Sequence, residues 1–198
     1  MKVLTKHMNY CSRQLQNDNR ELGYMKNIIL VGYMGCGKTT VGKNLARICN
    51  FAFLDTDELI EEQQGRSISE IFATDGEAAF RDMETEVLKA MIEQQKEGLV
   101  ISTGGGMAVR EENRALLKQL GVVFYLKAKP ETVYERVKGD TKRPLLQCED
   151  PLSRIRQMQE QREPAYIDAA HHVIEVDEYR QQEIAEQIRT TGKAEGIL

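Results

Sequence analysis

The stretch Gly32-Tyr-Met-Gly-Cys-Gly-Lys-Thr39 is the strongest clue to the fold, because it matches the pattern G-x-x-x-x-G-K-[ST] in full. The apolar run Asn27–Val31 before it predicts a buried strand, and the apolar stripe of Lys38–Asn50 predicts a helix. A glycine-rich turn between a strand and a helix directs backbone N–H groups and the positive end of the helix dipole at phosphate oxygens. The motif therefore predicts a nucleotide-binding loop.

The polar groups of this loop have predicted tasks in binding ATP and Mg²⁺. Lys38 is predicted to reach the β- and γ-phosphates, and the Thr39 hydroxyl to ligate Mg²⁺. Cys36 is predicted to be a spacer in the loop rather than a nucleophile. The residues predicted to contact the nucleotide here are Gly35, Cys36, Gly37, Lys38, Thr39 and Thr40.

Composition limits the class of protein. The 198 residues carry 27 Lys and Arg against 31 Asp and Glu, a net charge of −4, and 41% are hydrophobic. This indicates about one globular domain and argues against binding nucleic acid or a membrane through bulk charge, although a local basic groove stays open. We expect no membrane span and no signal peptide. Four cysteines without a CxxC pair predict reduced thiols in a cytoplasmic protein.

Short apolar runs alternate with amphipathic stretches from Lys26 onward, which is typical of a parallel sheet with helices on both faces. Further strands are predicted at Phe51–Asp55, Leu99–Ser102, Gly121–Leu126 and His172–Glu175. Further helices are predicted at Asp57–Gln64, Ser67–Ala73, Asp75–Gln95, Glu111–Leu120, from Pro130, at Pro151–Ala170 and at Glu178–Arg189. We expect a poorly ordered extension at 1–24, a mobile loop at about 139–151 and a frayed end at 190–198.

Ligands of such sheets lie beyond the carboxyl ends of the strands, so the residues that follow the strands are the candidate site. Asp55 and Asp57 can divide the labour there, one near the metal and one accepting a proton from an acceptor hydroxyl. The alternative is a carboxylate that caps the next helix. Gly104–Gly106 can bring backbone N–H groups close to a ligand, or can be a plain connection.

Three arginines complete the candidate site. Arg81 and Glu84 lie three residues apart on a predicted helix, so Glu84 can hold the guanidinium that receives a carboxylate; the alternative is a surface ion pair. Arg162, on a later helix, can grip the same carboxylate from a second side. Arg143 lies in the predicted mobile loop, either as a lid residue that closes over the phosphates or as a solvated arginine.

Six motifs occur in one order across residues 26–177, and with them the chain resembles the shikimate kinase family. They are GYMGCGKTT at 32–40, FLDTD at 53–57, FRDMETEVL at 80–88, STGGG at 102–106, KRPLL at 142–146 and REPAY at 162–166. The resemblance implies a three-layer α/β P-loop kinase with a five-stranded parallel sheet of order 2-3-1-4-5. It also implies one domain over 25–198, with substrate-binding helices at about 57–96 and a lid at about 139–152.

The resemblance implies that the γ-phosphate of ATP is transferred to the 3-hydroxyl of shikimate, a step toward chorismate and the aromatic amino acids. It makes Asp57 the base, places Asp55 near Mg²⁺ through water, and puts Arg136 either beside the adenine or exposed on its helix. The implied catalytic residues are Lys38, Asp57 and Arg143; those binding shikimate are Asp57, Arg81, Gly104, Gly105, Gly106 and Arg162; those binding ATP include Arg136 and Arg143. We expect a monomer.

Other functions are weighed against this one. A gluconate kinase would also suit an aspartate and an arginine grip, whereas a nucleotide acceptor would demand more arginines than Arg81 and Arg162. A GTP-binding switch would need an NKxD element and a DxxG element after the third strand, and neither occurs in the sequence. The same absence disfavours an ATP-dependent regulatory module, whereas the intact Lys38, Thr39, Asp57 and Arg143 disfavour a catalytically inactive binding protein.

Overall fold

The computed structural model describes residues 26–139 and 148–198. Five strands form one parallel sheet in the order β2-β3-β1-β4-β5, which confirms the predicted order. The strands are β1 Asn27–Val31, β2 Ala52–Asp55, β3 Leu99–Ser102, β4 Gly121–Lys127 and β5 His172–Glu175. Each differs by at most one residue at either end from the predicted strand.

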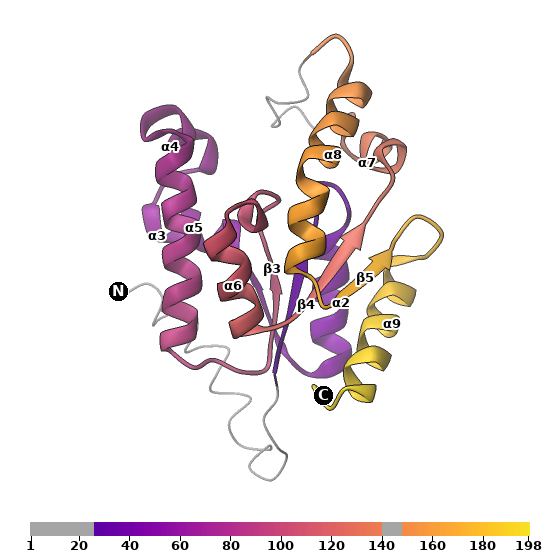
Figure 1. Cartoon of the computed structure of the whole chain (residues 1–198). Coiled ribbons are helices and arrows are strands. Elements are labelled where there is room, and N and C mark those ends of the chain that lie inside the picture. Colours follow the sequence, from indigo (N-terminus) through magenta and orange to yellow (C-terminus); the bar gives the residue numbers. More distant parts are fainter. Residues whose placement is uncertain (1–25, 140–147) are drawn as a thin grey trace.

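Helices cover both faces of this sheet and give the expected three layers (Figure 1). Helices α2 and α9 pack together on one face, while α5, α6 and α8 cover the other. The helices are α2 Lys38–Cys49, α3 Thr56–Gln64, α4 Ile68–Thr74, α5 Gly76–Glu93, α6 Glu111–Leu120, α7 Pro130–Val137, α8 Pro151–Ala169 and α9 Gln181–Ala194, with a short 3-10 turn, η1, at Met107–Val109. The expected extension at 1–24 and most of the expected lid, with Arg143, lie outside the described residues.

Burial of the strands explains why they are continuous apolar runs. All five residues of β1 and all four of β3 are buried, because helices lie on both faces of these central strands. The edge strand β5 alternates instead between half-buried and exposed positions. None of the helices in the described part of the chain combines the length and apolar character that a membrane crossing requires.

One buried asparagine ties together the amino-terminal edge of the sheet. Asn27 Nδ2 donates to the carbonyl oxygens of Lys96, at 2.7 Å, and Leu120, at 3.0 Å. Its Oδ1 accepts from the Leu99 N–H at 3.0 Å. The first residue of β1 therefore satisfies polar backbone groups at the start of β3 and the end of α6, where the ladder of the sheet does not reach them.

The carboxyl end of the chain differs from its prediction. Helix α9 begins three residues later than expected and continues to Ala194, so the expected fraying from residue 190 is wrong. The chain turns at Gly196, which has a φ of 67°, and the Ile197 N–H donates to the Gly192 carbonyl at 2.9 Å. Ile197 is then only 2% exposed, so its burial holds the end in place. This end lies below the sheet in Figure 1, at the edge opposite the carboxyl ends of the strands.

Candidate active site

The loop between β1 and α2 wraps around the amine of Lys38. Lys38 is 8% exposed, and its Nζ donates to the carbonyl oxygens of Gly32, at 2.8 Å, and Tyr33, at 3.1 Å. The chain can curl this tightly because Gly35 and Gly37 have φ values of 75° and 106°, which side chains rarely allow. The charged amine is thus held within the predicted phosphate-binding loop.

Thr39 and Asp55 face each other across the start of α2 and the end of β2. The Thr39 hydroxyl donates to Asp55 Oδ2 at 3.1 Å, and Asp55 Oδ1 accepts from the Asp57 N–H at 3.1 Å. Asp55 therefore caps α3, as the alternative interpretation expected, and also lies beside the predicted metal ligand. Both side chains offer oxygen atoms, the ligands that Mg²⁺ prefers, so the pair fits a magnesium ion that phosphate oxygens and water also coordinate. Thr40 is exposed and Cys36 is buried.

The Asp57 carboxyl is buried between charged groups of its own sign. Its Oδ1 finds no hydrogen-bond partner among residues 26–139 and 148–198, and a Cβ added at Gly104 would overlap this oxygen. Burial, followed by the charges of Asp55 and Glu84, raises the pKa of Asp57 to about 7, against the lowering effect of Lys38. A carboxyl with this pKa can both take up and release a proton at neutral pH.

Arg81 is held by two glutamates of its own helix, α5. Its Nη1 donates to Glu84 Oε2 at 2.8 Å, and its Nη2 to Glu77 Oε1 at 2.9 Å. Glu84 is fully buried, so its contact with Arg81 is not the surface ion pair of the alternative interpretation. Burial raises the pKa of the Glu84 carboxyl, while Arg81 lowers it. The guanidinium lies so close to Gly106 that any Cβ at this glycine would overlap it.

The second arginine approaches the same glycine loop from α8. Arg162 Nη1 is 3.4 Å from the carbonyl oxygen of Gly105, and its guanidinium lies over the Tyr33 ring, 5.9 Å from the centroid. The Tyr166 hydroxyl, on the next turn of α8, also donates to the Gly105 carbonyl. The fold therefore brings Arg81 and Arg162 to one loop.

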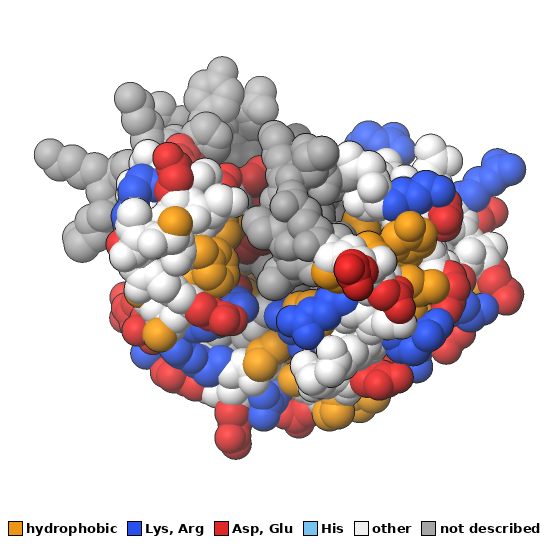
Figure 2. All heavy atoms as spheres, turned by 90° about the horizontal axis from the view of Figure 1, so that it is seen from above, with side chains coloured by type: hydrophobic (Ala, Val, Ile, Leu, Met, Phe, Trp, Pro, Cys, Tyr) orange, Lys and Arg blue, Asp and Glu red, His pale blue; other side chains and the backbone are white. Residues whose placement is uncertain are grey.

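Arg136 of α7 contacts the phosphate-binding loop itself. Its Nη1 donates to the carbonyl oxygens of Gly35, at 3.2 Å, and Cys36, at 3.1 Å. Arg136 is also exposed, so its helix position matches the alternative interpretation while its guanidinium contacts the loop. Figure 2 looks down on the edge of the molecule at the carboxyl ends of the strands, and the coloured side chains visible there are basic and acidic in alternation rather than of one sign.

One functional contact was missed, and its residue stands inside a quoted motif. The Thr56 hydroxyl accepts from the Gly104 N–H at 3.0 Å and so fixes the start of the glycine loop to the first residue of α3. Its place within the FLDTD motif was the signal in the sequence that could have identified it.

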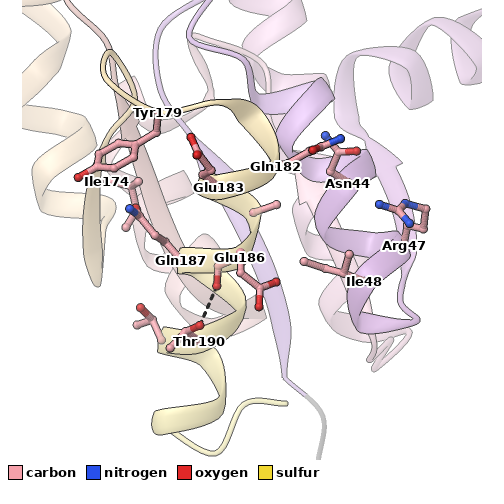
Figure 3. A pocket seen from close by; sticks show the side chains of 12 residues that line it. Asn44, Arg47, Ile48, Ile174, Tyr179, Gln182, Glu183, Glu186, Gln187 and Thr190 are labelled. Carbon is pink, nitrogen blue, oxygen red and sulfur yellow. Dashed lines mark hydrogen bonds between the residues drawn. The ribbon is translucent and has the colours of Figure 1, made fainter.

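A groove on another surface, between α2 and α9, contains none of the predicted site residues (Figure 3). Asn44, Ile48 and Glu183 are among its lining side chains.

Comparison with known proteins identifies the family. The family model for shikimate kinase matches residues 34–192, which is most of the chain. The chain belongs to the shikimate kinase family. A curated shikimate kinase from Thermodesulfovibrio yellowstonii is 45% identical over 83% of this chain and 93% of the relative. Another, from Paracidovorax citrulli, is 42% identical over 86% of this chain and 96% of the relative.

Solved structures of shikimate kinases share the fold. The enzyme from Acinetobacter baumannii, solved in complex with shikimate, superposes with a TM-score of 0.81 at 40% identity, over 86% of this chain and 94% of that one. The enzyme from Bacteroides thetaiotaomicron gives a TM-score of 0.77 at 32% identity, over 85% and 98% of the two chains. As a member of the shikimate kinase family, the chain is an enzyme with the P-loop kinase fold, and ATP is its phosphoryl donor.

Proposed function

We propose that the chain transfers the γ-phosphate of ATP to the 3-hydroxyl of shikimate. The observation that carries this proposal is the convergence of Asp57, Arg81 and Arg162 on the loop Gly104–Gly106. Shikimate has one carboxylate and several hydroxyls. Two guanidinium groups can pair with the carboxylate of shikimate, and the buried carboxylate of Asp57 can accept a hydrogen bond from one of its hydroxyls. The glycines let the ligand approach the backbone.

In this proposal Asp57 accepts the proton of the 3-hydroxyl as the hydroxyl oxygen bonds to the γ-phosphorus, while the bond from that phosphorus to the β–γ bridging oxygen breaks and releases ADP. Its pKa of about 7 leaves a large ionised fraction at neutral pH, which the task of a general base requires. Arg81 and Arg162 hold the carboxylate and so orient the hydroxyl for in-line attack. Lys38 balances the charge that develops on the phosphate oxygens, an effect worth a few kcal/mol, about as much as other positioned charges in water-poor sites.

The remaining parts of the proposal rest on the resemblance together with local chemistry. We infer that Thr39 and, through water, Asp55 hold Mg²⁺, which when bound neutralises phosphate charge. The nucleotide contacts proposed are Gly35, Cys36, Gly37, Lys38, Thr39, Thr40 and, beside the adenine, Arg136, with Arg143 over the phosphates.

We further propose a monomer with one kinase domain over 25–198. A cytoplasmic location is supported by the free thiols of Cys36, Cys49 and Cys148 in the described part of the chain.

A coupled assay of ATP consumption with a panel of hydroxy-acid acceptors tests this function. We expect consumption to require shikimate, with gluconate giving only the background rate, and ³¹P NMR to show one phosphomonoester product. Gluconate is the matched control, because it also presents one carboxylate and several hydroxyls but lacks the rigid ring. Activity with gluconate and none with shikimate would contradict the proposal.

A further inference from the structure

A cluster of three polar residues lies behind the Arg81 turn of α5 and belongs to none of the predicted site sets. It consists of Thr85 on α5, Arg110 just before α6, and Asn113 on α6. Thr85 is 3% exposed and Asn113 is fully buried. Because burying polar groups costs free energy unless they are hydrogen-bonded, the buried polar atoms of this polar cluster need hydrogen-bond partners.

Asn113 bridges α5 and the segment that follows the glycine loop. Its Oδ1 accepts from the Thr85 hydroxyl at 2.7 Å, and its Nδ2 donates to the Met107 carbonyl at 3.0 Å. Met107 directly follows Gly106, and its own N–H donates to the Gly104 carbonyl at 3.2 Å. One side chain of α6 therefore connects α5 to the loop that the Arg81 guanidinium touches.

Arg110 adds a second connection, to the backbone of Arg81 itself. Its Nη1 donates to the Thr85 hydroxyl oxygen at 3.1 Å and to the Arg81 carbonyl at 3.2 Å, and pairs with Asp82 at 2.7 Å. The Thr85 hydroxyl is also 3.0 Å from the Arg81 carbonyl. A hydroxyl has one proton to donate, and the shorter distance of 2.7 Å assigns that proton to Asn113 Oδ1. The Arg81 carbonyl then accepts its hydrogen bond from Arg110.

These hydrogen bonds set the distance between Arg81 and the loop it lies against. The guanidinium is held on one side by Glu84 and packs against Gly106 on the other, so a small shift of α5 would move it relative to the loop. We propose that Thr85, Arg110 and Asn113 are positioning residues that hold the Arg81 guanidinium where it receives the substrate carboxylate. This inference rests on the proposed function and goes beyond it, because none of the three residues is expected to touch the substrate.

The test replaces the Thr85 hydroxyl by a methyl group. Thr85→Val keeps the shape but leaves the Asn113 oxygen without its donor, and we expect the KM for shikimate to rise about ten-fold, equivalent to about 1.4 kcal/mol of binding. The KM for ATP and kcat should stay within about two-fold, since the phosphate-binding loop is not part of the cluster. Thr85→Ser, which restores the hydroxyl, should return the KM for shikimate to within about two-fold of wild type. Arg81→Ala, which removes the guanidinium itself, should give the largest rise in the KM for shikimate.

A matched control separates positioning from general stability. Asn27 is also buried and loses three hydrogen bonds in Asn27→Ala, but it lies at the opposite edge of the sheet. This variant should lower Tm at least as much as Thr85→Val while leaving the KM for shikimate unchanged, below the temperature at which either variant unfolds. An unchanged KM for shikimate in Thr85→Val, an equal rise for both substrates, or no recovery in Thr85→Ser would each overturn the inference.

If Thr85→Val does not fold, Arg110→Gln decides the question, because Arg110 is only half-buried and its loss leaves the Thr85–Asn113 hydrogen bond intact. We expect a several-fold rise in the KM for shikimate alone, and no change in that value would overturn the inference. A wild-type enzyme that does not phosphorylate shikimate would contradict the proposed function instead, so the two failures are distinguishable.

Discussion

The Asp57 carboxyl is the residue whose chemistry depends most on its surroundings. Its pKa rises from 3.8 to about 7 because it is buried and because Asp55 and Glu84 are negative neighbours. The folded protein therefore favours the neutral form, and the associated stability is fully present below about pH 4 and is lost as the pH rises through 7. At about 1.4 kcal/mol per pKa unit, the cost of ionising this carboxyl in the fold is a few kcal/mol.

We predict that Asp57→Asn stabilises the fold at alkaline pH while it removes the base. The amide cannot ionise, so Tm of the variant minus Tm of the wild type should be larger at about pH 8 than at about pH 5. The turnover rate should fall by orders of magnitude with ATP binding nearly intact. Thermal melts at both pH values and a coupled assay measure these effects.

Glu58→Gln is the matched control, because Glu58 is exposed on the same helix, α3. This variant should leave the Tm difference the same at both pH values and the turnover within about two-fold. A turnover of Asp57→Asn equal to that of the wild type would remove Asp57 as the base.

Local motifs predicted the polar residues that meet at the strand ends, because parallel strands place their carboxyl ends at one edge. They did not predict the raised pKa of Asp57, which depends first on burial and then on the charges of Asp55 and Glu84, the latter a residue distant along the chain. Nor did they predict the polar cluster, since Thr85 and Asn113 are 28 positions apart and join in a contact that no spacing rule encodes.

At the scale of elements, the segment that follows α9 shows where the periodicity of apolar residues does not predict which residues are buried. Ile197 follows Gly196 near the end of the chain, so no repeating apolar pattern surrounds it and the sequence predicted fraying. Its burial comes from a turn that folds the end back onto Gly192. The inner strands were predictable for the opposite reason, because burial on both faces requires runs of apolar residues.

We predict that Ile197→Ala lowers the free energy of unfolding by about 2–4 kcal/mol, as other large-to-small changes in cores do. The KM values and kcat should stay within about two-fold, because this end is at the edge opposite the candidate site. Urea denaturation followed by circular dichroism measures the stability. Lys193→Ala, at an exposed position of α9, is the control and should change it by less than about 0.5 kcal/mol. Equal effects of the two changes would show that the end is not packed in solution.

For the whole molecule, we predict that residues 1–24 are dispensable. The first strand begins at Asn27, and the shikimate kinase family model matches from residue 34. A chain that begins at Met25 should keep kcat and both KM values within a few-fold of the full chain and lower Tm only slightly. Steady-state kinetics and thermal melts compare the two proteins, and a shortened chain that does not fold would show that the extension is part of the core.

The position of the carboxyl terminus has a practical consequence for the whole molecule. The described chain ends below the sheet, whereas the candidate site lies beyond the carboxyl ends of the strands, at the other edge (Figure 1). An affinity tag or surface attachment joined to Leu198 would therefore leave the substrate entrance facing the bulk solution. The enzyme is suited to immobilisation through this end by way of a short linker, which would spare the packing of Ile197.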